Sequence, residues 1–230
     1  VVESLGRIGS SQAVPALINI VNDASYRERW AAAYALGRIR DRQAVAALAH
    51  CLESEEDENM RRAAAEALGE IGDAESVPAL ISALTDPGWF VRWAAAHALG
   101  QIHDAAAVPA LLALLDDPHE KVRWATAEAL GKLGDSRAAE RLIAALNDPA
   151  WEVCQAAARA LHQVCRVATI PALIEAMRQR NEFVRRTTAH ALRRIETPDA
   201  IPYLMQAIRS EEAFIRAIAA EQIVHLRTVN

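Results

Sequence analysis

Histidine and cysteine are the residue types in this chain that most often act as metal ligands or nucleophiles. The 230 residues include seven histidines and three cysteines. The histidines are scattered, and the only adjacent His-Glu pair is His119-Glu120. A metal site requires several such ligands brought together in a fixed geometry. We therefore predict that the chain has no metal site.

Cysteine usage predicts no disulfide framework. Cys51, Cys154 and Cys165 form no CxxC pair, which favours a reducing compartment and the cytoplasm as the location. Cys154 is predicted to lie near Arg123 and Arg185, which would lower its thiol pKa; the alternative is a small buried residue. Without a phosphate loop or a Ser-His-Asp pattern, we predict no catalytic residue and no cofactor.

Aromatic residues are the other candidates, because they gather at helical spacing. Trp30 and Tyr34 lie four residues apart, as do Trp89 and Trp93, so each pair falls on one face of a helix. Ten of the eleven aromatic residues occupy related positions in the chain, and Tyr203 is the exception. Large partly exposed aromatic side chains in one patch usually bind something. The alternative is that they pack against one another.

The charge of the chain restricts the class of partner. The formal charge is −5, from 25 basic and 30 acidic residues. Eight basic and eight acidic residues accompany the aromatic residues on the same predicted face. This balance favours neither nucleic acid nor an anionic membrane, and no apolar run is long enough to cross a bilayer. The chain starts at Val1 without a methionine, so we expect it to be part of a longer or processed polypeptide.

The elements that position these residues are repeats. Ala-Leu-Gly and its variants recur every 31 or 32 residues, with the central residue at Leu5, Leu36, Leu68, Leu99, Leu130, Leu161, Leu192 and Ile223. This period is typical of a solenoid, whose units bury their apolar faces against each other. In the unit 105–135, Val108 to Leu115 predicts helix A and Val122 to Leu133 predicts helix B, with Asp117-Pro118 between them.

The predicted fold is therefore all-α: a right-handed α-solenoid, or superhelix, of about seven antiparallel helix pairs. We predict one domain over residues 1–230, with a partial repeat in residues 1–10. The predicted pairs are 11–41, 42–73, 74–104, 105–135, 136–166, 167–197 and 198–230.

The unit from Asp117-Pro118 through Val122-Arg123 to Ala129-Leu130-Gly131 resembles the HEAT-repeat family, and in particular the short HEAT-like repeats of phycobiliprotein lyases. The resemblance covers essentially the whole chain. It implies that helix B lines the concave side, and that an acid and an arginine form a ladder between successive repeats. The implied ladder residues are Arg29, Arg61, Arg92, Arg123, Arg185, Arg216, Asp23, Asp86 and Asp117.

Two features of this pattern change in the later repeats. Cys154 stands where an arginine is expected, and all nine glycines lie at or before Gly134. His162, Arg193 and Val224 occupy the later positions equivalent to Gly131. Because larger residues in a close-packed seam push helices apart, we predict a change of curvature between residues 130 and 195.

The sequence thus favours a non-catalytic scaffold or adaptor that binds a protein or peptide through an aromatic-rich concave face. The predicted partner-binding residues are Tyr26, Trp30, Tyr34, Arg62, Trp89, Phe90, Trp93, His97, Trp124, Glu128, Trp151 and Arg159. The family resemblance implies one alternative, a bilin-lyase-type subunit that handles a transient bilin and works as a heterodimer. A homo-oligomeric structural module is the other alternative.

Overall fold

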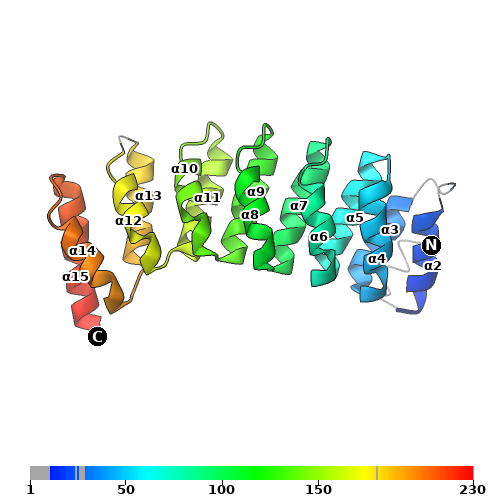
Figure 1. The fold of residues 1–230 in the computed structure, drawn as a ribbon, viewed down its shortest axis with the longest axis horizontal. Coiled ribbons are helices and arrows are strands. Elements are labelled where there is room, and N and C mark those ends of the chain that lie inside the picture. The colour runs from blue at the N-terminus through cyan, green and yellow to red at the C-terminus, as the bar shows by residue number, and fades with distance from the viewer. Residues whose placement is uncertain (1–10, 24, 26–28, 180, 230) are drawn as a thin grey trace. The chain divides into compact units, whose positions relative to one another are not determined.

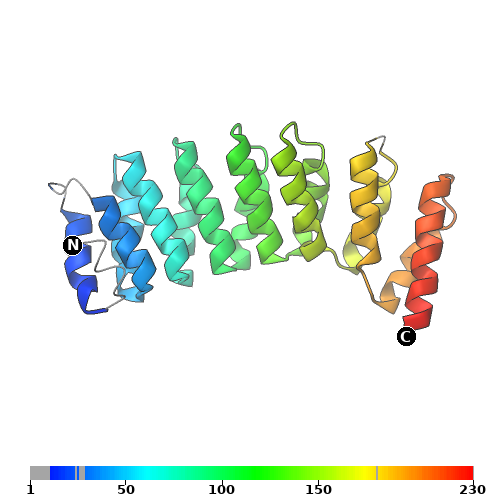
Figure 2. The same cartoon turned by 180° about the vertical axis from the view of Figure 1, so that it is seen from behind.

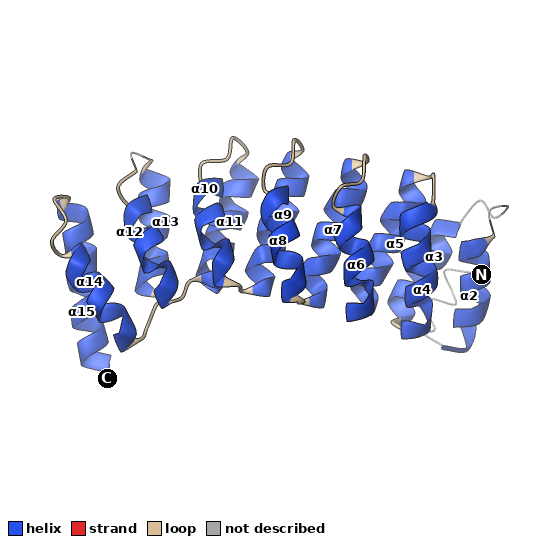
Figure 3. Cartoon of the chain, viewed as in Figure 1, coloured by secondary structure: helices blue, strands red, loops and turns tan. Residues whose placement is uncertain are grey.

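The computed structural model describes residues 11–23, 25, 29–179 and 181–229. Within these ranges every regular element is a helix (Figure 3), which confirms the predicted all-α solenoid class. The chain divides into two compact units, Val1–Leu133 and Gly134–Asn230. Each unit is built from antiparallel helix pairs and is described by itself.

The described residues of the first unit form eight α-helices in two layers. Figure 1 shows the A helices in front, and Figure 2 shows the B helices in front. The A helices are α2 (Val14–Asn22), α4 (Val45–Ser54), α6 (Val77–Ala83) and α8 (Val108–Leu114). The B helices are α3 (Arg29–Ile39), α5 (Glu58–Ile71), α7 (Trp89–Ile102) and α9 (Glu120–Leu133).

Six α-helices with the same alternation make up the part of the second unit that the structure describes. Its A helices are α10 (Ala139–Ala145), α12 (Ile170–Ala176) and α14 (Ile201–Ala207). Its B helices are α11 (Trp151–Val164), α13 (Glu182–Arg193) and α15 (Ala213–Val229). In the described residues of both units, no helix is long and apolar enough to span a bilayer.

Local sequence signals explain how each pair begins. A short 3-10 turn precedes every A helix, and Asp41, Asp73, Asp104 and Asp135 each accept a hydrogen bond from the backbone N–H two residues ahead. This contact satisfies one of the backbone donors that a helix start leaves without a partner. Proline then occupies the first turn of α2, α6, α8, α12 and α14, where its missing N–H costs nothing.

Glycine sets the spacing of the B helices in the first unit. A Cβ atom added at Gly69 would lie 2.8 Å from the Cα of Ala98, and one added at Gly100 would lie 2.8 Å from the Cα of Ala129. Gly37 meets α5 in the same way, 2.9 Å from the Cα of Ala67. These distances are shorter than any ordinary carbon contact, so the B helices pack backbone against backbone only because these positions lack a side chain.

The second unit fills the equivalent positions with side chains. His162 on α11 pairs with His190 on α13, with 3.0 Å between His190 Nδ1 and His162 Nε2. Arg193 on α13 reaches Glu221 on α15 at 2.6 Å. In Figure 2 the ribbons of α11, α13 and α15 stand farther apart than those of α3, α5 and α7. The change of curvature predicted between residues 130 and 195 involves both units, and it stays a prediction.

Arginine side chains join the repeats of the first unit. Arg92 Nε and Nη2 donate to both carboxylate oxygens of Asp117, at 2.7 and 3.0 Å, while Nη1 donates to the carbonyls of Asp86 and Pro87. Arg61 binds Asp86 in the same way, at 2.7 and 2.9 Å. Each guanidinium therefore caps its own turn and holds the next one. We call the contacts of Arg61 with Asp86 and of Arg92 with Asp117 the arginine ladder.

The ends of the ladder differ from this arrangement. Arg29 binds Glu55 at 2.7 Å, while Asp23 accepts hydrogen bonds from Ser25 that lower the pKa of its carboxyl. Arg123 caps its own turn by donating to the carbonyls of Asp117 and Pro118.

In the second unit other groups take over these roles. The thiol of Cys154 donates to the carbonyl of Asp148 at 3.1 Å, the position that an arginine holds elsewhere. Asn147 bonds to Gln179 and Asn181, at 3.0 and 2.9 Å, so neutral amides connect these turns. Arg216 still caps its own turn, whereas Arg185 lies over the ring of Phe214 at 5.9 Å.

The arginine ladder predicts a large difference between two ion pairs of similar composition. The side chains of Arg92 and Asp117 are 13% and 4% exposed, whereas those of Arg42 and Glu75, also paired, are 72% and 71% exposed. Asp117→Ala leaves a half-buried guanidinium without its carboxylate, and we expect a loss of about 3 kcal/mol of unfolding free energy. Glu75→Ala should cost no more than about 1 kcal/mol.

Urea denaturation of the four single variants Asp117→Ala, Arg92→Ala, Glu75→Ala and Arg42→Ala, and of the double variant of each ion pair, gives the coupling energy of each ion pair. Equal coupling energies for the two pairs would contradict the role assigned to the ladder.

Candidate functional site

The described aromatic residues of the first unit lie on its B helices and none of them is buried. Trp30 is 47% exposed and Phe90 is 43% exposed, while Tyr34, Trp89, Trp93 and Trp124 are partly exposed. We call these six residues the aromatic face. Tyr26, which was predicted to belong with them, lies outside the described residues.

Helical spacing explains why these side chains share one face. Trp30 and Tyr34 are one turn apart on α3, and their rings meet edge to face at 5.9 Å. Trp93 and His97 are one turn apart on α7, with rings nearly parallel at 5.9 Å and 9°. Alanine occupies most of the opposite, buried side of these helices. Large residues therefore point away from the helix seam.

Trp89 lies at the centre of a stack at the start of α7. Its ring centroid is 3.6 Å from that of Phe90 and 3.7 Å from that of His119, which precedes α9. Lys121 Nζ lies over the Trp89 ring at 5.6 Å, and the guanidinium of Arg62 lies over Phe90 at 5.9 Å. This end of the aromatic face is thus held by contacts between three repeats.

Within the aromatic face, Trp93 contacts the ring of His97, which lies on α7 beside the six defined residues. Burial lowers the pKa of His97, and the neighbouring Lys132 lowers it further, against the opposing effect of three glutamates. The imidazole is therefore neutral near pH 7. Trp124 on α9 has no ring contact with a described residue. Of the three indoles on α7 and α9, those of Trp93 and Trp124 make fewer contacts with described rings and cations than that of Trp89 does.

A hydrogen-bonded network links α3 to α5 beside the tryptophans. Arg62 Nη1 donates to Glu66 at 3.1 Å, and the phenol of Tyr34 is hydrogen-bonded to the same carboxylate. Burial and the contact with Glu66 raise the pKa of Tyr34 to about 12. Tyr34, Arg62 and Glu66 therefore have fixed positions on the aromatic face.

The remaining predicted binding residues belong to the second unit. Trp151 on α11 is 53% exposed and contacts Phe183 on α13, with ring centroids 4.9 Å apart. Arg159, also on α11, is exposed. The structure therefore divides the predicted set between two units. In the first unit it places Glu128 on α9 and His97 on α7, at equivalent positions of successive repeats.

The thiols are not activated. All three cysteines are buried. Burial raises the pKa of Cys51 to about 11 and also raises the pKa values of Cys154 and Cys165. The lowered pKa predicted for the Cys154 thiol is therefore wrong, because burial and the nearby carboxylate of Asp148 raise the pKa by more than the backbone hydrogen bonds lower it. Among the described residues there is no cluster of three or more metal-ligating side chains.

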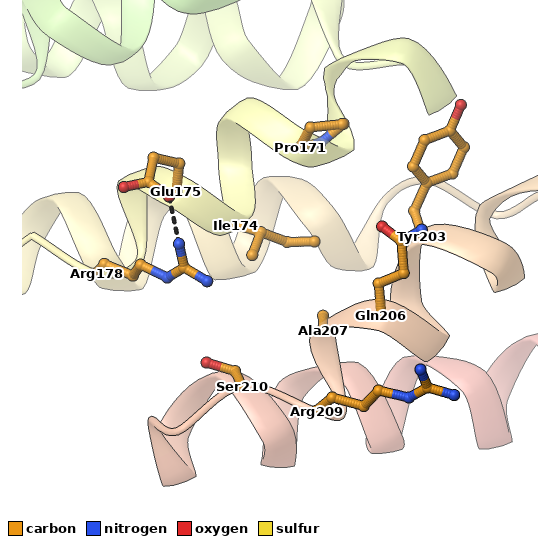
Figure 4. Close-up of a pocket in the computed structure, with 9 residues that line it drawn as sticks. All are labelled: Pro171, Ile174, Glu175, Arg178, Tyr203, Gln206, Ala207, Arg209 and Ser210. Carbon is orange, nitrogen blue, oxygen red and sulfur yellow. Dashed lines mark hydrogen bonds and ion pairs between the residues drawn. The ribbon is translucent and has the colours of Figure 1, made fainter.

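Sequence reasoning missed a pocket on the A helices of the second unit. An open pocket of about 300 Å³ lies between α12 and α14 (Figure 4). Its lining residues are Pro171, Ile174, Glu175, Arg178, Tyr203, Gln206, Ala207, Arg209 and Ser210. The available signal was Tyr203, the single aromatic residue on a helix A, which is 37% exposed beside Met205 at 46%.

The network of Tyr34, Arg62 and Glu66 predicts an abnormal tyrosine titration. The Glu66→Gln variant removes the carboxylate charge that disfavours the phenolate, so the pKa of Tyr34 should fall from about 12 toward its ordinary value of 10. Absorbance at 295 nm as a function of pH measures this ionisation. Glu75→Gln, at an exposed position on the 3-10 turn before α6, is the matched control. An unchanged titration in Glu66→Gln would contradict the network.

Comparison with known proteins agrees with this architecture. The model of the HEAT repeats family matches residues 1–68, 50–120, 91–161 and 139–223. No curated protein matches the chain. The solved complex of CpcE and CpcF of phycocyanin lyase from Nostoc sp. PCC7120 contains a chain that is 30% identical. The match covers 91% of this chain and 86% of that chain, with a TM-score of 0.61.

More distant structures share the fold alone. YibA of E. coli is 21% identical, with 98% of this chain and 85% of that chain covered and a TM-score of 0.61. An engineered protein is 22% identical, and the match covers 93% of this chain and 68% of that chain with a TM-score of 0.62. Since the family model covers nearly the whole sequence and a 30% identical relative covers most of it, this chain belongs to the HEAT repeat family.

Proposed function

We propose that this chain is a non-catalytic scaffold that binds a protein or peptide through the aromatic face of its first unit. The observation that carries the proposal is the set of partly exposed aromatic residues on neighbouring B helices, with no described aromatic side chain buried. Each such side chain has a surface of roughly 150–250 Å². Partial exposure of six of them gives a patch of the size that marks interaction sites.

The composition of the aromatic face fits a protein partner. Tryptophan, tyrosine and arginine are the residues that contribute most binding energy in protein interfaces, inside a rim of polar groups. Trp93 and Trp124 supply large ring surfaces, and Arg62 and Glu66 form a polar pair beside them. Because the glycine contacts and the arginine ladder fix the B helices, little conformational entropy is lost on binding.

A second candidate is a subunit of the bilin-lyase type, favoured by the 30% identity to a chain of the CpcE–CpcF complex of phycocyanin lyase. In this case the aromatic face would stack on an open-chain tetrapyrrole, and a second HEAT-repeat chain would complete a heterodimer. The three thiols of this chain are buried with raised pKa values. They are therefore poor nucleophiles, so the acceptor cysteine for the bilin would belong to the phycobiliprotein.

The scaffold function predicts that partner recovery depends on two indoles. The double variant Trp93→Ala/Trp124→Ala should lose most of the proteins captured by the intact chain from its native cells, since both anchors are removed. Quantitative mass spectrometry of the captured proteins is the measurement. Tyr203→Ala/Met205→Ala, which removes exposed apolar side chains from an A helix of the second unit, should retain them. Recovery of the same proteins by both double variants would refute the binding role of the aromatic face.

The bilin alternative predicts a spectral response. Adding an open-chain tetrapyrrole to the purified chain should shift the visible absorbance of the bilin and quench tryptophan emission, because the pigment would lie within contact of the indoles. Trp93→Ala/Trp124→Ala should weaken both signals, whereas Trp151→Ala should leave most of the quenching. If neither signal appears, with or without a second HEAT-repeat chain present, the bilin role is wrong.

A further inference from the structure

Two histidines of the second unit face each other across the seam between its B helices. His162 Nε2 on α11 and His190 Nδ1 on α13 lie 3.0 Å apart, and the two ring centroids are 4.8 Å apart. The sequence predicts no metal site because its histidines are scattered. The fold nevertheless joins these two, which are 28 positions apart in the chain, so their chemistry as a pair has to be considered.

The distance between the two nitrogens matches that between two ligands of one metal ion. Imidazole nitrogens bind zinc at about 2.0–2.1 Å. With bonds of about that length, two nitrogens lie about 2.9 Å apart when they bind at a right angle, and about 3.3 Å apart at the tetrahedral angle. The observed 3.0 Å is closer to the right angle, which neighbouring ligands have in the tetragonal coordination of copper(II).

The protonation state of the pair suits a metal ion. Burial lowers the pKa of His162, and the nearby His190 and Arg194 lower it further, so this ring is neutral near pH 7. Between two neutral imidazoles one nitrogen donates and the other accepts, and each ring can carry its hydrogen on either nitrogen. When the donating ring moves its hydrogen to its outer nitrogen, both facing nitrogens present a lone pair, and no proton is released overall.

An ion can replace the present contact at a small cost. The ring centres are closer than a straight hydrogen bond across 3.0 Å allows, so this hydrogen bond is bent and therefore weakened. His190 is exposed and His162 is partly exposed, so water can reach an ion held between them. The positive charge of Arg194 opposes a bound cation, but this side chain is exposed, and water and salt screen its charge.

The position of the pair gives such an ion a structural consequence. His162 stands where the first unit has a seam glycine, and α11 and α13 pack less closely than α5 and α7 do. An ion bound to both imidazoles would join these two loosely packed helices. It would bind the native state and not the unfolded chain, in which the two rings are separated, and would therefore stabilise the second unit.

We propose that His162 Nε2 and His190 Nδ1 bind one copper(II) ion, with water in its other coordination positions. Of the divalent first-row ions, copper(II) binds nitrogen ligands most tightly, so it is the ion that a site with only two protein ligands holds best. The site lies in the unit without the aromatic face, and it does not depend on the proposed scaffold function.

Calorimetric titration of the full chain with copper(II) chloride, in a buffer that does not bind copper, tests the proposal. His190→Gln should weaken binding at this site by at least about tenfold, because loss of a direct ligand costs no less than loss of an outer hydrogen-bond partner. His225→Gln makes the same substitution at an exposed position on α15 in the same unit. This control should bind copper(II) as the intact chain does.

Two further measurements report the site itself. The electron paramagnetic resonance spectrum at one equivalent of copper(II) should show hyperfine coupling to two imidazole nitrogens in the intact chain and in His225→Gln. Copper(II) should also raise the melting temperature of both proteins, measured by circular dichroism, because the ion joins α11 to α13. His162→Gln, which keeps a polar side chain at the seam, should show neither effect.

The opposite results overturn the proposal. Equal affinity for copper(II) in His190→Gln and His225→Gln would show that the ion binds elsewhere on the chain. A spectrum without coupling to two nitrogens would contradict the assigned ligands. Tighter binding of zinc(II) than of copper(II) would contradict the assigned ion and its tetragonal geometry.

Discussion

The bidentate contact between an arginine and the aspartate of the next repeat is the interaction on which the first unit depends. Arg92 binds both oxygens of Asp117 and two carbonyls of its own turn. A helical repeat of this size cannot bury its apolar face alone, and its turns contain backbone groups that need partners. One guanidinium meets both requirements, because its donors form a rigid planar fork.

The close seam of the B helices depends on the same register. Gly69 and Gly100 allow α5, α7 and α9 to approach until backbone meets alanine, and a small shift along the helix axes would bring larger side chains into that contact. Because the inner side of each B helix is filled by alanine and glycine, its aromatic residues lie on the other side. The requirements of packing thus place Trp93 and Trp124 where a partner can reach them.

The second unit shows what happens when both features are lost. Cys154 replaces an arginine of the ladder, and His162 and Arg193 replace the seam glycines. The structure compensates with neutral amides between turns, an imidazole pair and an ion pair between B helices. These contacts occupy more space than backbone packing does, and a pocket lies between α12 and α14 on the A side. The two units therefore offer different surfaces built from the same repeat.

The sequence by itself determined the repeat, the alternation of A and B helices, and the face on which the aromatic residues lie. All of these follow from local periodicity and from the turn residues Asp, Pro and Gly. Tertiary structure decided which groups meet. It joined Tyr34 to Glu66 and stacked Trp89 on His119, it raised the pKa of Cys154 where a lowered one had been considered, and it formed a pocket beside Tyr203. Contacts between repeats and the burial of ionisable groups depend on distances between residues about 30 positions apart, and periodicity fixes only which residues share a face.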